Sequence, residues 1–168
     1  STCDLPSDSV QKYNIHVVPT YAQFGQESLA DDGVELTRSA FYQRLATNSV
    51  HPTTSAPSLG ETLQAMEQGL QEAEHVIAIT AASTLSSIHN TFLLAAKQTD
   101  PDRVTVIDSR MLSMGVGWLV LRAAEMNAQH MPPTAIVEAI QALKPRVDVW
   151  AALDTLEYLR RSGRVGWA

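Results

Sequence analysis

HVIAIT at residues 75–80, together with RVTVID at residues 103–108, decides the fold. The first stretch is a short, nearly continuous apolar run, and the second is rich in β-forming residues. An apolar run that follows a helical pattern predicts a strand that is buried on both faces, as in a parallel sheet. Because helical patterns alternate with the strands, we expect βαβ crossovers and a three-layer α/β/α domain with a mainly parallel sheet.

Helical patterns surround both strands. Ser58 and Glu61 have the spacing of a capping box, which predicts the start of a helix before the first strand. Apolar stripes at 85–96, 116–124 and 136–143 repeat with the spacing of one helical face and predict three further helices. The crossover between the two strands is therefore helical, which supports parallel pairing.

The N-terminal part carries a different pattern. Residues 15–24 are rich in β-forming residues and predict a strand, which Pro19 places at an edge or a bend. Residues 25–33 have the composition of a turn, and Thr37 is placed to cap a short helix with Phe41 on its apolar face. The polar residues 47–57 carry two prolines and predict a loop.

A break near Lys144–Pro145 suggests a domain boundary. We therefore expect an N-terminal α/β domain at 1–145, and at 146–168 the beginning of an incomplete second α/β domain. Within that second part, residues 146–153 predict a strand, and Asp154 with Glu157 predicts a capped helix that Gly163 ends.

Composition excludes several classes of protein. The chain has 168 residues, of which 45% are hydrophobic and 18% charged, as in a folded globule. Its net charge of −6 lacks the basic footprint of a nucleic-acid binder, and no apolar run approaches the length needed for stable membrane insertion. Cys3 is the one cysteine in the sequence, which favours a reducing compartment, and no signal-peptide pattern is visible. We therefore expect a cytoplasmic protein.

Hydroxyl side chains gather where ligands of parallel sheets bind, beyond the carboxyl ends of strands. The turn 81–87 ends in Ser86 and Ser87, and free backbone N–H groups at a helix start attract anions. Thr54 and Ser55 supply further hydroxyls in the loop 47–57. From these residues alone, plain helix capping is the favoured explanation of the first group, and a solvated linker is the favoured explanation of the second.

Other chemistry is less well supported by the sequence. The chain has neither a G-x-S-x-G elbow nor a phosphate-binding P-loop, and its histidines lack metal-ligand spacing. Gly115 and Gly117 favour close helix packing over a dinucleotide site. His89 follows Ser86 by three residues, so a small-molecule α/β hydrolase that uses this pair is an alternative function. A purely structural interaction module is a third.

Eight sequence blocks resemble the motifs of one known family and follow its order through nearly the whole chain. They are STCDLP at 1–6, YNIHVVP at 13–19, DGVELT at 32–37, TTSAPS at 53–58, LSS at 85–87, VIDSR at 106–110, MGVG at 114–117 and DTLEYLRRSGR at 154–164. They are similar to the motifs of DegV family proteins, except that Ala56 stands where glutamine is usual and Ser87 where glycine is usual.

The resemblance implies a two-domain fold, related to the substrate-binding subunit of dihydroxyacetone kinases. It implies one long-chain fatty acid bound between the domains and presented to a separate ATP-dependent fatty acid kinase subunit. The binding protein would then do no bond chemistry and would need no cofactor. The family's carboxylate contacts correspond to Thr54, Ser55 and Ser86, with a backbone contribution near Ser87. Family chains also begin with an additional strand and continue into a complete second domain, so the resemblance implies that this chain is a fragment.

Overall fold

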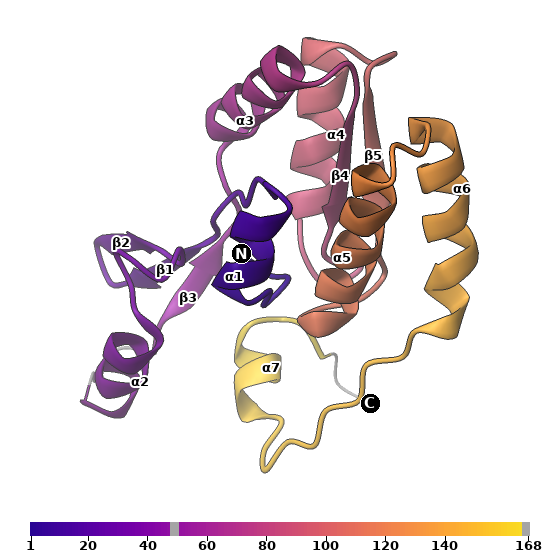
Figure 1. Ribbon diagram of the computed structural model, residues 1–168. Helices are drawn as coiled ribbons and strands as arrows, with labels where there is room; N and C mark the ends of the chain where they lie inside the picture. The colour runs from indigo at the N-terminus through magenta and orange to yellow at the C-terminus, as the bar shows by residue number, and fades with distance from the viewer. Residues whose placement is uncertain (48–50, 166–168) are drawn as a thin grey trace.

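The computed structural model describes residues 1–47 and 51–165. Its centre is the parallel pair of β4 (Val76–Thr80) and β5 (Val104–Asp108), in which Val76 lies opposite Val104 and Thr80 opposite Asp108. On one face of this sheet lie α3 (Leu59–Glu72) and α4 (Ile88–Thr99). On the other lie α5 (Met114–Ala128) and α6 (Pro133–Leu143) (Figure 1). The predicted α/β/α layering is confirmed.

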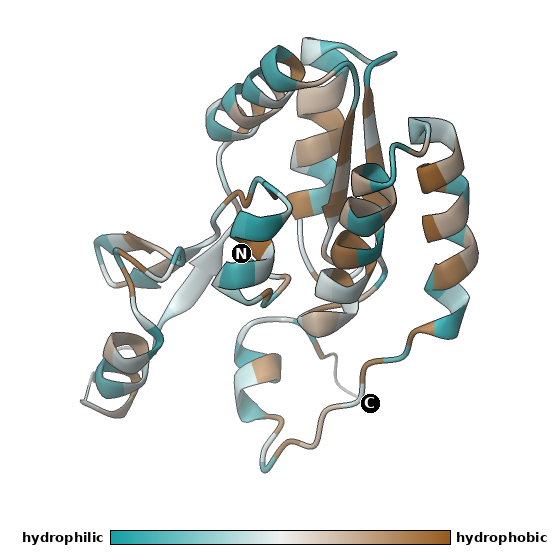
Figure 2. Ribbon diagram, in the orientation of Figure 1, coloured by the Kyte–Doolittle hydropathy of each residue, from teal (hydrophilic) through white to brown (hydrophobic). Residues whose placement is uncertain are grey.

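Each face of the sheet has its own hydrophobic core. Val104 of β5 packs with Met66, Ala95 and Ala96 from α3 and α4. The other face of β5 carries Ile107, which packs with side chains from α5 and α6: Leu119, Ile136 and Ile140. Alternate strand residues point to opposite faces, so an uninterrupted apolar sequence is what a strand between two helical layers requires. Figure 2 shows this apolar character along both strands.

A second, antiparallel sheet stands beside this layered unit. It consists of β1 (Tyr21–Phe24), β2 (Glu27–Ala30) and β3 (Thr53–Ser55), in the order β2-β1-β3. Three predictions are corrected here. The predicted strand 15–24 is regular only over β1, the predicted turn 25–33 contains β2, and the predicted loop 47–57 contains β3. A tight hairpin at Gly25, whose φ is +67°, joins β1 to β2 and pairs Phe24 with Glu27.

The short helix α2 (Arg38–Thr47) packs on this sheet through Phe41, whose ring meets that of Phe24 edge-on at 6.1 Å between centroids. Its predicted start is confirmed, because the Oγ1 atom of Thr37 accepts a hydrogen bond from the N–H of Ala40. The predicted capping box is present at the start of α3, where Ser58 and Glu61 exchange side-chain and backbone hydrogen bonds. Both starts follow from local sequence alone.

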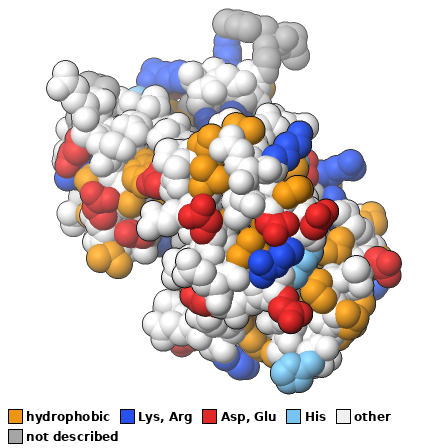
Figure 3. Space-filling model, turned by 90° about the horizontal axis from the view of Figure 1, so that it is seen from above, with side chains coloured by type: hydrophobic (Ala, Val, Ile, Leu, Met, Phe, Trp, Pro, Cys, Tyr) orange, Lys and Arg blue, Asp and Glu red, His pale blue; other side chains and the backbone are white. Residues whose placement is uncertain are grey.

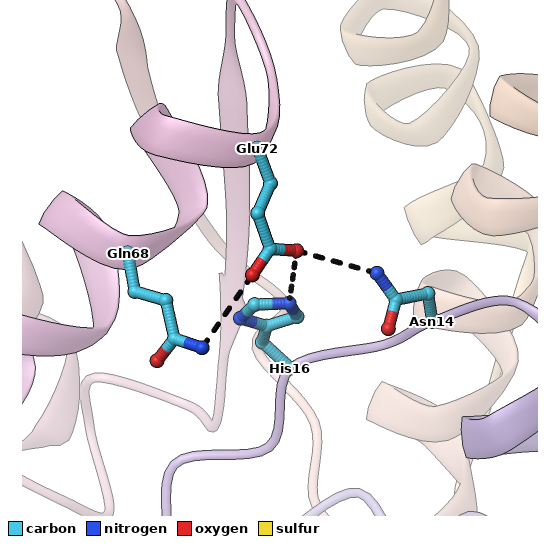
Figure 4. A network of polar contacts seen from close by, with 4 residues as sticks. All are labelled: Asn14, His16, Gln68 and Glu72. Atoms are coloured by element: carbon cyan, nitrogen blue, oxygen red, sulfur yellow. Dashed lines mark hydrogen bonds and ion pairs between the residues drawn. The ribbon is translucent and has the colours of Figure 1, made fainter.

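The segment 13–18, which follows α1 (Ser7–Lys12), lies across the C-terminal end of α3. Glu72 of that helix contacts both Asn14 and His16: its Oε2 atom is 3.3 Å from Asn14 Nδ2 and 3.1 Å from His16 Nε2 (Figure 4). Gln68 donates to the other carboxylate oxygen at 3.4 Å. These polar contacts attach the segment to the layered unit.

The C-terminal part differs from its prediction. After the 3₁₀ turn η1 (Lys144–Arg146), residues 147–156 have no regular structure, so the predicted strand 146–153 is wrong. Val147 packs on the core beneath α6, but Trp150 is 91% exposed, and no described strand pairs with this segment. The helix α7 (Glu157–Arg161) begins later than predicted, and its N-cap is Leu156 rather than Asp154. Gly163, with φ +71°, ends it as predicted.

Candidate ligand site at the carboxyl ends of the strands

The carboxyl ends of β4 and β5 lie at the lower edge of the sheet in Figure 1, where α4 and α5 begin. Ser86 lies in the turn that connects β4 to α4. Its N–H donates to the carbonyl of Ala82 at 3.1 Å, and its Oγ accepts from the N–H of Ile88 at 3.4 Å. Since Oγ is used there as an acceptor, its hydrogen can be donated to a ligand.

Ser87 is the N-cap of α4, but its side chain makes no capping hydrogen bond, and it is exposed. Capping was the competing explanation for the hydroxyls of this turn. Within the described turn, the Ser87 hydroxyl does not serve that purpose. The Ser86 hydroxyl serves it in part, because its oxygen accepts the N–H of Ile88, the first residue of α4. Its hydrogen remains available, and a hydroxyl donor at a helix start can bind an anion.

Asp108, the last residue of β5, holds the same turn from the other strand. Its Oδ2 accepts from the hydroxyl of Ser83 at 2.6 Å, and its Oδ1 accepts from the N–H groups of Ser83 at 3.2 Å and Arg110 at 2.9 Å. The link between Asp108 and Ser83 was not predicted from the sequence. Only the register of the two strands, which places Thr80 opposite Asp108, brings these loops together.

Two ionisable side chains at this edge of the sheet, Asp108 and Lys144, have shifted pKa values. Burial raises the pKa of the Asp108 carboxyl, but the hydrogen bonds from Ser83 and Arg110, with the nearby His89, outweigh burial and hold this pKa below its ordinary value. Burial, together with the nearby Arg110, lowers the pKa of Lys144. The described residues contain no group of three or more side chains suited to a metal ion.

The predicted Ser86–His89 pair is not formed in the described structure. His89 Nδ1 lies 3.0 Å from Thr80 Oγ1, at the end of β4, and no hydrogen bond joins it to Ser86. The reason is local: α4 begins at Ile88, so Ser86 precedes the helix and the spacing of helical neighbours does not apply. The geometry thus gives no support to the hydrolase alternative.

Thr54 and Ser55 lie on β3, which pairs with β1. Ser55 Oγ accepts from Gln23 Nε2 at 3.0 Å, and Thr54 Oγ1 accepts from Arg164 Nη2 at 3.3 Å, so each hydroxyl keeps its hydrogen for another acceptor. Neither Gln23 nor Arg164 was predicted from the sequence as a partner. No hydrogen bond joins these two hydroxyls to the Ser86 turn in the parts of the chain that the structure describes.

Apolar side chains are exposed close to the lower edge. They follow β4 and β5 or lie in the first turns of α5: Leu85, Leu112, Met114 and Trp118. The irregular segment 147–156 adds exposed side chains, among them Trp150, and it touches α5, because a Cβ atom on Gly115 would collide with Val149. Seen from above, the opposite end of the sheet carries interspersed acidic and basic side chains (Figure 3).

A separate groove of about 440 Å³ follows β4 between α3 and α5. Its walls include Met66, Ile77, Ile79 and Val120, and its lining includes none of the four predicted site residues. The N–H of Val76 donates to Arg103 and the carbonyl of Thr80 accepts from Ser109, both on the β5 side. Backbone groups alternate between the two edges of a strand, so Ile77 and Ile79 direct theirs into the groove, where no described strand pairs with them.

The model of the family described as "Uncharacterised protein, DegV family" matches residues 1–168. The chain belongs to the DegV family. A DegV domain-containing protein from Caldanaerobacter subterraneus is 34% identical over 165 residues, which are 98% of this chain and 58% of that protein. The chain thus spans about three fifths of the length of such relatives. No helix among the described residues has the length and apolar character to cross a membrane.

Solved DegV structures share the fold. A DegV protein from Thermus thermophilus, described by its fatty acid binding, superimposes with a TM-score of 0.88 at 33% identity over 99% of this chain and 59% of its own. The Streptococcus pneumoniae fatty acid kinase B3 protein loaded with linoleic acid matches with a TM-score of 0.68 at 26% identity, over 76% of this chain and 45% of its own. A fatty acid is therefore the ligand named for both of these structures.

Proposed function

We propose that this protein binds one long-chain fatty acid and that the hydroxyls of Ser86, Thr54 and Ser55, with the backbone near Ser87, hold its carboxylate. The observation that carries the proposal is the Ser86 turn: a hydroxyl with its hydrogen available, at the start of α4, beside exposed apolar side chains. Neutral donors at a helix start suit a carboxylate. The ligands of the solved relatives support the same chemistry.

Burial of the tail supplies the binding energy. An acyl chain of about fifteen methylene groups at about 0.8 kcal/mol each gives a gross gain of about 12 kcal/mol. Loss of translational and conformational freedom reduces that gain substantially, but enough remains for tight binding. The exposed side chains Leu85, Leu112, Met114 and Trp118 lie in the loops after β4 and β5 or in the first turns of α5, at the same edge of the sheet as the Ser86 turn. We therefore propose that the tail begins there.

The groove along β4 suits a different occupant. The backbone N–H and C=O groups of Ile77 and Ile79 face it, and a hydrocarbon tail would leave these polar groups without hydrogen bonds. An extended polypeptide backbone satisfies such an edge, whereas an alkyl chain does not. We therefore assign the acyl tail to the lower edge of the sheet and not to this groove.

The proposed role is to present the bound acid rather than transform it. Hydroxyl donors leave the carboxylate open to a separate ATP-dependent kinase subunit, whereas a buried arginine fork would hold it more tightly. The proposal assigns residues 1–145 to a carboxylate-binding domain and 146–168 to the beginning of a second domain. It needs no cofactor and places the protein in the cytoplasm, where such a kinase would meet it.

Titration of the delipidated protein with palmitate tests the proposal. The Ser86→Ala variant loses one hydrogen bond to a charged group, worth about 1.5–3 kcal/mol, so we expect binding weaker by roughly ten- to a hundredfold. Ser39→Ala, which changes an exposed serine of α2, is the matched control and should bind as the unmodified protein does. Equal affinity in Ser86→Ala and Ser39→Ala would contradict the assigned carboxylate site.

A further inference from the structure

The two loops at the lower edge of the sheet are joined through one carboxylate. Asp108 ends β5, yet it accepts two hydrogen bonds from the loop that follows β4, including its shortest: the Ser83 hydroxyl lies 2.6 Å from Oδ2, and the Ser83 backbone nitrogen lies 3.2 Å from Oδ1. Within its own loop, Asp108 accepts the N–H of Arg110 at 2.9 Å. Three donors from two loops therefore meet on a single side chain.

A short chain of hydrogen bonds leads from this carboxylate to Ser86. Ala82, the neighbour of Ser83, donates its N–H to the carbonyl of Met111 at 2.9 Å, which is a second link between the two loops. The carbonyl of Ala82 then accepts the N–H of Ser86 at 3.1 Å and that of Leu85 at 3.0 Å. Ser83 and Ala82 are thus both fixed to the β5 loop, and the position of Ser86 follows from theirs.

We propose that Asp108 is a positioning residue, which holds the Ser86 hydroxyl in the orientation that recognises an acidic ligand head group. This inference rests on the proposed function and adds the residue that determines its selectivity for a carboxylate. Asp108 does not touch the ligand in this scheme. It fixes the direction of the donor, and direction is the property on which the strength of a hydrogen bond to a charged group depends.

The charge of Asp108 is compatible with an anionic ligand nearby. Its oxygens face inward to the donors of Ser83 and Arg110, while the cationic groups of Arg110 and Lys144 are close enough to influence the edge electrostatically. Asparagine at position 108 can keep all three contacts, because its Oδ1 atom accepts the N–H groups of Ser83 and Arg110 and its NH₂ group donates to the Ser83 hydroxyl. It loses the negative charge, however, so each of these hydrogen bonds is weaker than in the carboxylate.

The test compares two ligands with the same tail. Affinities for palmitate and for hexadecanol are measured in the full chain, and their ratio reports how strongly the site prefers a carboxylate. We expect Asp108→Ala to lower this ratio about tenfold, as the loss of one well-directed hydrogen bond to a charged group would, and Asp108→Asn to lower it by less. Asp102→Ala, an exposed aspartate at the opposite end of β5, should leave the ratio unchanged.

If Asp108 had a purely structural role, Asp108→Ala would weaken the binding of palmitate and hexadecanol equally. An unchanged ratio in Asp108→Ala would therefore overturn the inference while leaving fatty acid binding intact. Ser83→Ala removes the 2.6 Å contact but retains the carboxylate, so it provides the same measurement if Asp108→Ala fails to fold. If the unmodified protein shows no preference for palmitate over hexadecanol, both the proposed carboxylate site and this inference are wrong, and that result is visible before any variant is made.

Discussion

Replacing Gly117 by alanine tests how closely the N-terminal loop approaches α5. A Cβ atom on Gly117 would come within 3.0 Å of the backbone carbonyl oxygen of Cys3 and to 3.2 Å from Met114 Sδ. Real Cβ atoms essentially never approach a backbone oxygen so closely, so the loop would have to move away from the helix. The Gly115–Gly117 pair predicted close packing of this helix, but the sequence did not predict that the neighbours would be the Cys3 loop and Val149 of the irregular segment.

The expected size of the effect follows from two opposing contributions. Alanine favours a helix over glycine by up to about 1 kcal/mol, whereas overpacking at a close contact costs about 1–3 kcal/mol. We therefore expect Gly117→Ala to lower the free energy of unfolding by about 1–2 kcal/mol. At roughly 2–4 °C per kcal/mol for a chain of this size, Tm should fall by about 2–8 °C in a thermal melt followed by circular dichroism.

Gly60→Ala provides the matched control. Gly60 lies in the first turn of α3, is exposed, and has no neighbour nearer to a new Cβ than Ser58 Oγ at 4.0 Å. The substitution there should leave Tm unchanged or raise it slightly. If Gly117→Ala matched or exceeded the stability of Gly60→Ala, the close approach of Cys3 to α5 would be wrong.

Three further predictions concern the core, a helix cap and acid stability. Ile140→Ala removes a fully buried side chain and should lower the free energy of unfolding in guanidinium chloride by about 2–5 kcal/mol, whereas Val34→Ala, 84% exposed, should change it by less than about 0.5 kcal/mol. Ser58→Ala breaks the capping box of α3 and should cost about 1 kcal/mol, with faster amide exchange confined to the first turn of that helix. Asp108 has a lowered pKa in the folded state, so its contribution to stability is complete above about pH 4 and is lost as pH falls through the folded pKa. The difference in stability between the unmodified protein and Asp108→Asn should therefore be constant at neutral pH and shrink in acid, and a difference that grew in acid would contradict the hydrogen bonds assigned to Asp108.

The elements of the layered unit were predictable because their causes are local. The apolar runs of β4 and β5 and the capping box at Ser58 are properties of a few consecutive residues. The antiparallel sheet was not predictable in this way. Its strands have three or four residues, and β1 gains its second partner from β3, where Ala22 lies opposite Thr54. Pairing over such a distance leaves little trace in the sequence near either strand.

The strand predicted over residues 146–153 shows that a β-forming composition is not enough to make a strand. The segment has the β-forming composition of a strand, but composition does not supply a partner, and no described strand lies beside it. Its side chains instead divide between the core, where Val147 packs, and solvent, where Trp150 lies. A local pattern determines a helix better than a strand, because a helix completes its backbone hydrogen bonds within itself.

The sequence by itself determined the two buried strands, the helices that cover them and the hydroxyl-rich turns at which a ligand is expected. Only the tertiary structure decided how those turns are held. The pairing of Thr80 with Asp108 brings Ser83 to a carboxylate that lies 25 residues further along the chain. The physical reason is that residue types and their spacing specify which donors a loop can offer, whereas strand register and helix packing specify where each donor points.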